Sequence, residues 1–183
     1  MKNIIADSLF LLGLTSSICN QSFKKETTNH SDWIKLSLPN GWILQAPKGF
    51  RAKTLQGIDS EPGVINSKQD SIYLQFDSGT EMMKKRDCSF TNNIEKAKES
   101  IEKGFYKTFY KIPSEHIAYV DTIDNKVAII VRPTMSGHGT VAINISDCKT
   151  GEWLGITGTD LTLVKENIVL DIFKTIKLPK KEE

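Results

Sequence analysis

Two pairs of residues have the types and spacing that nucleophilic catalysis requires. Ser136 and His138 are two positions apart in a glycine-containing loop, and Cys88 could be activated by His116. A serine nucleophile needs a base that is held within hydrogen-bond reach and oriented by an acid. The sequence has no Gly-x-Ser-x-Gly elbow to supply that rigidity. We therefore assign no catalytic residue and keep a small exported hydrolase as the alternative interpretation.

Another group of polar residues is better suited to recognition. Asp59 and Ser60 lie between Gly57 and Gly63, and glycines allow a ligand to approach the backbone closely. Asp77 ends a predicted strand and would join them if the two flanking strands pair. The simpler interpretation is that Asp59 and Ser60 cap local turns through their own side chains. The alternative is a binding site formed by Asp59, Ser60 and Asp77.

The three tryptophans are a further candidate for ligand contact. Trp33, Trp42 and Trp153 could each stack on a sugar, as an envelope protein would require. Each also stands at the start or end of a predicted strand, where a large aromatic side chain usually closes a core. We prefer the core interpretation for all three.

Metal and cofactor sites have no recognisable pattern in this chain. The histidines, His30, His116 and His138, form no His-x-x-x-His pair, and no Cys-x-x-Cys pair, EF-hand loop or glycine-rich phosphate loop occurs. We predict neither a metal nor a cofactor.

The N-terminus predicts export. Lys2 supplies a positive charge, and the apolar segment 8–15 ends in small residues and Cys19. This segment is too short to span a bilayer, which takes about 20 apolar residues. The segment resembles a bacterial lipoprotein signal, although Ile18 stands where that signal has a small residue, and this resemblance implies lipidation of Cys19. Ordinary cleavage near the same position is the alternative.

Two cysteines remain for the exported domain. Cys88 and Cys148 would lie in an oxidising compartment, where an even pair favours a disulfide. The alternative is two unpaired thiols that pack as small apolar groups.

Composition limits the class of partner. The chain has 183 residues, of which 39% are hydrophobic and 25% charged, as in an ordinary globular protein. With 24 basic and 22 acidic residues the formal charge is only +2. This balance gives no basic footprint, so we expect no nucleic-acid partner.

Periodicity divides the chain into a signal peptide (1–18), a flexible tether (19–31), one α+β domain (32–179) and a polar tail (180–183). Strands are predicted at 33–38, where Ile34, Leu36 and Leu38 share a face, at 42–44, and at 71–77. Residues 47–63 are predicted to be irregular, with short extended pieces between turns. A helix capped by Thr91 or Asn92 should follow.

Residues 115–158 predict a four-stranded antiparallel meander with a two-residue turn at Asp124-Asn125. Its second strand is apolar on both faces and should be covered on both. A final helix after Asp160 should bury Leu161, Val164, Ile168 and Ile172. The expected fold is therefore a mostly antiparallel central sheet packed by about two helices.

The order of elements, from an early Leu-Pro-x-Gly-Trp strand (38–42) to the terminal helix ending Phe-Lys-Thr-Ile-Lys-Leu (173–178), resembles the Mog1/PsbP-like fold, an α/β/α sandwich. Residues 56–60 together with 72–79 also look like a stretch found in uncharacterised bacterial envelope lipoproteins. The PsbP-like resemblance implies a non-catalytic accessory role. We expect a lipid-anchored domain, on the outer membrane or the periplasmic face, that binds a protein or glycan. A periplasmic immunity-type protein is a further alternative.

Overall fold

The computed structural model describes residues 31–80, 93–103, 115–147 and 150–179. Its first elements are β1 (Trp33–Ser37) and β2 (Ile43–Pro47), which pair in an antiparallel two-stranded sheet across the short 3-10 turn η1 (Pro39–Gly41). Both strands were predicted. Leu36 and Leu38 are buried as expected, but Ile34 is exposed because β1 covers the core only with its later residues.

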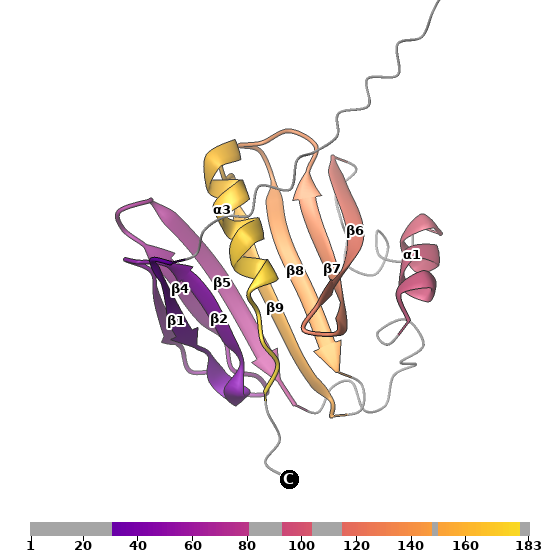
Figure 1. The fold of residues 1–183 in the computed structure, drawn as a ribbon, viewed down its shortest axis with the longest axis horizontal. Coiled ribbons are helices and arrows are strands. Elements are labelled where there is room, and N and C mark those ends of the chain that lie inside the picture. The colour runs from indigo at the N-terminus through magenta and orange to yellow at the C-terminus, as the bar shows by residue number, and fades with distance from the viewer. Residues whose placement is uncertain (1–30, 81–92, 104–114, 148–149, 180–183) are drawn as a thin grey trace, which may run out of the picture.

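A seven-stranded sheet forms the centre of the molecule (Figure 1). The spatial order is β3-β4-β5-β9-β8-β7-β6, and every neighbouring pair is antiparallel. The strands are β3 (Arg51–Thr54), β4 (Gly63–Ser67), β5 (Ile72–Gly79), β6 (His116–Ile123), β7 (Lys126–Pro133), β8 (Thr140–Asp147) and β9 (Glu152–Thr159). The predicted meander is confirmed as β6 to β9, and its last strand joins the meander to β5.

Strands β3 and β4 lie at one edge of the sheet, partly in the segment predicted to be irregular. β3 is a short edge strand with exposed Arg51, Lys53 and Thr54, so it shows no apolar alternation. β4 begins at Gly63, whose missing side chain makes room for Phe76: a Cβ there would come 2.2 Å from that ring. Neither strand could be predicted from apolar periodicity, because β3 lies at the edge of the sheet and β4 begins at a closely packed glycine.

The helix α1 (Ile94–Glu102) packs against β6 and β7. Its N-cap is Asn93, whose side-chain oxygen accepts hydrogen bonds from the N–H groups of Glu95 and Lys96 at 3.0 and 3.1 Å. The prediction of a cap at Thr91 or Asn92 was therefore off by at least one residue, because Asn93 has the extended backbone and free acceptor that an N-cap requires.

The helix α3 (Leu163–Lys174) lies across one face of the sheet, beside the β1–β2 hairpin (Figure 1). It buries Val169, Ile172 and Phe173. The prediction that Val164 faces the core was wrong: its side chain is 70% exposed, because it lies on the side of α3 opposite the buried Glu166, Val169 and Phe173.

Alternation along the strands places the core between the sheet, α3 and the β1–β2 hairpin. Ile72, Leu74 and Phe76 of β5 point to this side, as predicted. Trp42 is completely buried in the same core, and Trp33 packs against it. Further members from β7, β8, β9 and α3 are Ala128, Ile130, Val141, Ile143, Ile145, Leu154, Ile156, Val169, Ile172 and Phe173. The fold is α+β, as the sequence predicts.

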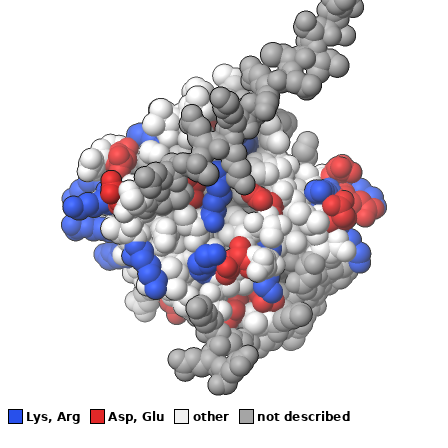
Figure 2. Space-filling view, in the orientation of Figure 1, with Lys and Arg blue, Asp and Glu red and all other residues white. Residues whose placement is uncertain are grey.

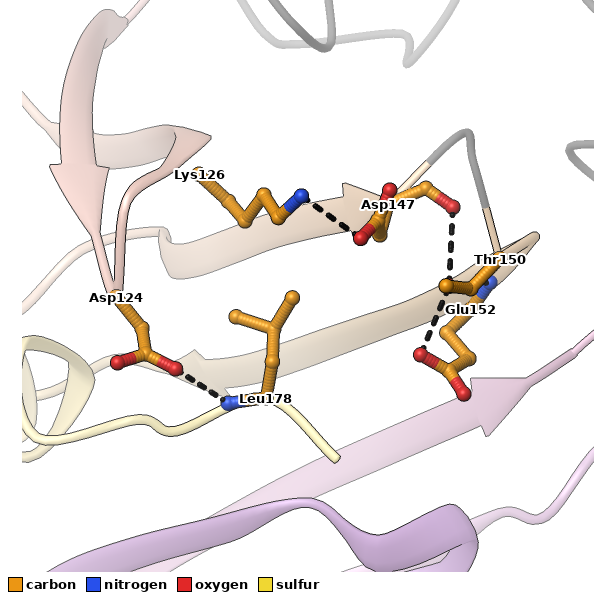
Figure 3. Close-up of polar contacts among 6 residues, drawn as sticks. All are labelled: Asp124, Lys126, Asp147, Thr150, Glu152 and Leu178. Atoms are coloured by element: carbon orange, nitrogen blue, oxygen red, sulfur yellow. Dashed lines mark hydrogen bonds and ion pairs between the residues drawn. The ribbon is translucent and has the colours of Figure 1, made fainter. Parts of the chain in front are cut away.

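Polar contacts fix the end of the sheet at which β6 turns into β7 (Figure 3). Asp124 and Asn125 have φ angles of 48° and 63°, as the predicted two-residue hairpin turn requires. Lys126 forms an ion pair with Asp147 at 2.7 Å, and the Thr150 hydroxyl donates to Glu152 at 2.8 Å. These contacts join the β6–β7 turn to the segment between β8 and β9.

Charged side chains are interspersed on the α3 face. Figure 2 shows blue and red groups among neutral residues over the described part of this face. Among the described residues, no helix has the length and apolarity to cross a bilayer.

Candidate functional site

The face of the sheet opposite α3 carries a row of residues from three adjacent strands. Asp77 of β5 is the register partner of Gly155 of β9, and Gly155 is the partner of Asn144 of β8. Directly paired residues in antiparallel strands project to the same face. A carboxylate and an amide therefore flank a position that has no side chain.

This row forms the floor of an open cleft with a volume of about 490 Å³. A Cβ atom added to Gly155 would meet only the Asn144 Oδ1 atom at 3.3 Å and a backbone oxygen at 4.0 Å. The described part of the chain therefore leaves the space directly above Gly155 open. The volume is within the range of about 300–1,000 Å³ that small-molecule sites occupy.

Trp153 forms the wall at one end of the cleft. A Cβ atom on its register partner, Gly79, would come 2.6 Å from the indole Nε1, so the indole lies directly against this glycine. The side chain is half-buried and lines the cleft instead of entering the main core. The prediction of a core position was therefore wrong for Trp153, because it points to the opposite face from Leu154.

Loop 55–62 closes one side of the cleft by folding back on β5. The Leu55 N–H donates to the Pro62 carbonyl at 2.8 Å, and the Glu61 N–H donates to the Ser78 carbonyl at 2.8 Å. The Ser60 hydroxyl then donates to Asp77 Oδ2 at 3.1 Å. The sequence prediction that residues 57–63 approach the end of β5 is confirmed by these contacts and by the pairing of β4 with β5.

The two oxygens of the Asp77 carboxylate differ in their surroundings. Oδ2 accepts the Ser60 hydrogen bond, whereas Oδ1 is buried and has no hydrogen-bond partner in the described part of the chain. A buried acceptor without a partner costs about 1–3 kcal/mol, so a ligand donor at this point would be favourable. Asp59, the third predicted residue, is exposed and is not among the cleft-lining residues.

The cleft lining combines three aromatic residues with four polar ones. The aromatic residues are Tyr73, Phe76 and Trp153, and the polar residues are Gln75, Asp77, Asn144 and Thr157. No lysine or arginine is among the described lining residues. The lining can accept hydrogen bonds at the carboxylate and can both donate and accept them at the amides and hydroxyl groups.

The Ser136–His138 pair is arranged differently from a nucleophile and its base. The Ser136 hydroxyl donates to Glu166 Oε2 at 2.7 Å, and His138 is exposed. Glu166 is fully buried, and its other oxygen lies 2.8 Å from an Arg132 nitrogen. The glutamate thus joins the β7–β8 loop to the first turn of α3 through an ion pair and a hydrogen bond.

His116 is also tied to the backbone. Its Nε2 atom accepts a hydrogen bond from the Thr140 N–H at 2.7 Å, so this nitrogen carries no proton. Gly139 lies against the ring, since a Cβ there would come 2.6 Å from Nε2. Cys88, its proposed partner, lies outside the described residues.

The remaining cysteine predictions also fall outside the described residues. The lipidation candidate Cys19 and the disulfide candidates Cys88 and Cys148 lie in segments 1–30, 81–92 and 148–149. Within residues 31–80, 93–103, 115–147 and 150–179, no group of three or more His, Cys, Asp or Glu side chains is arranged to hold a metal ion.

Most of the cleft residues carry weak sequence signals. Gln75 and Asn144 are single polar residues on the outward side of apolar strands, a pattern that normally indicates a solvated face. Gly155 is a glycine inside a strand, which often marks a close approach of a ligand or another backbone. Gly155 was therefore the sequence feature that could have indicated the cleft.

Comparison with solved structures finds chains of similar fold. No family model and no curated protein sequence matches the chain. The solution structure of cyanobacterial PsbP (CyanoP) from Synechocystis sp. PCC 6803 is similar with a TM-score of 0.48 and 10% sequence identity. The match covers 83% of this chain and 95% of that chain.

Proposed function

We propose that this chain is an exported lipoprotein whose domain binds a protein or another component of the cell envelope and does not catalyse a reaction. The N-terminal sequence supports export and lipid anchoring, because its apolar segment ends at Cys19 and a polar tether of residues 19–31 follows. The open cleft on the sheet supports binding.

The observation that carries this proposal is the state of Asp77. One carboxylate oxygen is held by Ser60 at 3.1 Å, the other is buried without a partner in the described chain, and Asp77 lines a cleft of about 490 Å³. Polar groups that are fixed by the scaffold and left unsatisfied in a cavity are typical of ligand sites. The recognition surface is therefore the cleft, and Asp77 is its centre.

Site-specific photo-crosslinking in the intact cell envelope tests the binding role. A photoreactive side chain replaces Gln75 in the cleft or, as a control, Asn167, which is exposed on α3. We expect a discrete adduct from the Gln75 position that disappears in the Asp77→Asn background. Asp171→Asn on α3 is the matched control and should leave the adduct unchanged. Equal adducts from both positions, or none from the cleft, would contradict the proposal.

The anchor has a separate test. Cys19→Ser should abolish incorporation of labelled lipid and release the protein from the membrane fraction, because a thiol is the attachment point in a lipoprotein signal. Equal labelling of the wild type and the variant would end the lipoprotein assignment while leaving the cleft proposal intact.

A further inference from the structure

We propose that the cleft binds a stretch of glycan chain, with sugar rings against Trp153 and Tyr73 and with sugar hydroxyl or amide groups bonded to Asp77, Asn144 and Gln75. This inference rests on the proposed function, because it names the ligand class of the same cleft.

The aromatic side chains of Trp153 and Tyr73 lie at opposite ends of the cleft. Trp153 is in register with Gly79, whereas Tyr73 lies six residues earlier on β5, on the same face. At about 3.3 Å per residue, this places the two rings roughly 20 Å apart along the strand direction. The cleft is therefore elongated and suits a chain of linked rings better than a single compact molecule.

Both rings offer flat apolar surface with a polar edge. Tyr73 is 54% exposed, and the Trp153 indole is backed on one side by Gly79. A pyranose ring has an apolar C–H face and equatorial hydroxyl groups at its edge, so it can stack on an aromatic ring while its polar groups reach neighbouring side chains. The backing by Gly79 fixes the indole without covering its cleft side.

The polar groups between the rings match the edge of a sugar. Asp77 supplies an acceptor only, whereas Gln75, Asn144 and Thr157 supply both donors and acceptors. Every sugar hydroxyl both donates and accepts, and an acetylated amino sugar adds one N–H and one carbonyl. The partnerless Asp77 Oδ1 would accept from the ligand, and the adjacent Asn144 amide would complete the pair across Gly155.

The charge of the cleft lining favours a neutral glycan over an anionic ligand and over a cationic protein partner. The described lining has one carboxylate and no lysine or arginine, which disfavours phosphate and other anionic groups. A cationic side chain of a protein partner could also approach Asp77, but its attraction would be screened by salt. Binding of a neutral glycan depends on hydrogen bonds and stacking, so it should be nearly independent of ionic strength.

Titration with defined oligosaccharides tests the proposal. The full chain in detergent is titrated with chitotetraose and with cellotetraose, and binding is followed by calorimetry and by amide chemical shifts. We expect saturable binding of at least one of them, with shifts concentrated in β5 and β9. Asp77→Asn and Tyr73→Ala should each reduce affinity by about tenfold, which corresponds to about 1.4 kcal/mol. Asp171→Asn should have no effect.

A second variant distinguishes loss of binding from loss of folding. Gly155→Val fills the floor of the cleft but leaves Asp77 in place, and valine is favoured in strands. It should keep the unfolding temperature of the wild type and still abolish binding. Affinity should change less than about twofold when the salt concentration rises from about 50 to 500 mM. A large salt dependence with a basic peptide as the better ligand would overturn the glycan class in favour of a protein partner.

The outcomes separate the two proposals. If neither oligosaccharide binds at about 10 mM, weaker than a standard free energy of about −3 kcal/mol, the glycan inference is wrong. Persistence of the Asp77-dependent crosslink from the Gln75 position would then keep the cleft as the recognition surface. Absence of both oligosaccharide binding and the crosslink would show that the cleft is not the recognition surface.

Discussion

The hydroxyl of Ser60 donates to Asp77 Oδ2 at 3.1 Å, although the two residues are 17 positions apart in the sequence. This contact joins loop 55–62 to the end of β5, where the Glu61 N–H also reaches the Ser78 carbonyl at 2.8 Å. Because one carboxylate oxygen is already occupied, the orientation of the other is set before any ligand arrives. Preorganisation of this kind reduces the cost of binding.

The Ser60→Ala variant should show how much the hydrogen bond between Ser60 and Asp77 contributes to stability. Removing the donor leaves both Asp77 oxygens without a partner among the described residues, so we expect the free energy of unfolding to fall by about 1 kcal/mol. Urea unfolding provides the measurement, with Ser37→Ala on the exposed side of β1 as the control. An unchanged free energy of unfolding for Ser60→Ala would mean that the loop is held by its backbone bonds alone.

The ion pair between Arg132 and Glu166 should be a second determinant of stability. The glutamate is fully buried, while the arginine side chain is 37% exposed. Arg132→Met leaves a buried carboxylate without its cation, which should cost about 2 kcal/mol, below the usual figure for fully buried pairs because water reaches the guanidinium.

The matched double variant isolates that interaction. Adding Glu166→Leu to Arg132→Met removes the stranded charge and should recover part of the lost stability. Ser136→Ala, which removes only the 2.7 Å hydrogen bond to Glu166, should cost about 1 kcal/mol. A loss for Arg132→Met no larger than that for Ser136→Ala would show that the carboxylate does not need its cation.

Regular alternation made much of the fold predictable from sequence. In β5 and β8 apolar residues recur at every second position and face one core, so the pattern alone fixes strand and face. The Asp124-Asn125 turn was predictable because its positive φ angles need residues of this type. β3 could not be predicted from alternation, because the sequence of an edge strand with charged side chains resembles that of a loop.

The candidate site was less predictable, because pairing between distant strands creates it. Asp77, Gly155 and Asn144 become neighbours only when β5 joins β9 and β9 joins β8. The approach of Ser60 to Asp77 was expected on the condition that the strands flanking the loop pair, and β4 and β5 do pair. The role of Trp153 was not, because the face to which it points depends on the strand register.

Tyr119 should make stability depend on alkaline pH. Burial raises the pKa of its hydroxyl; nearby Arg132 opposes the shift, and Asp121 and Glu166 add to it. In the unfolded chain tyrosine ionises near pH 10. The folded state therefore keeps its proton to higher pH, and its contribution to stability is fully present below about pH 10 and is lost as pH rises through the folded pKa.

The measurement compares the wild type with Tyr119→Phe, which cannot ionise. The difference in their free energies of unfolding should be constant between about pH 7 and 9 and should change above about pH 10, as the wild type loses stability more steeply. Ultraviolet titration of the folded proteins should show that the late-ionising phenol is missing in the variant. Parallel curves throughout this range would contradict the assignment.

Asp124 should hold the C-terminal segment onto the sheet (Figure 3). Its Oδ2 accepts the Leu178 N–H at 2.9 Å, and its Oδ1 forms an ion pair with Lys177 at 2.9 Å. Lys177 in turn exchanges backbone hydrogen bonds with Ile43 of β2. One side chain in the β6–β7 turn therefore positions the chain after α3 beside the β1–β2 hairpin.

Two substitutions at Asp124 separate its two contacts without straining the turn, since asparagine and glycine both tolerate its φ of 48°. Asp124→Asn keeps an acceptor for the Leu178 N–H and loses only the exposed ion pair, so the free energy of unfolding should fall by about 0.5 kcal/mol or less. Asp124→Gly loses both contacts and should cost about 1–2 kcal/mol. Amide hydrogen exchange at Leu178 should accelerate strongly only in the glycine variant, and Lys177→Ala should match the asparagine variant. Equal exchange at Leu178 in all four proteins would show that the backbone bonds to Ile43 hold this segment without Asp124.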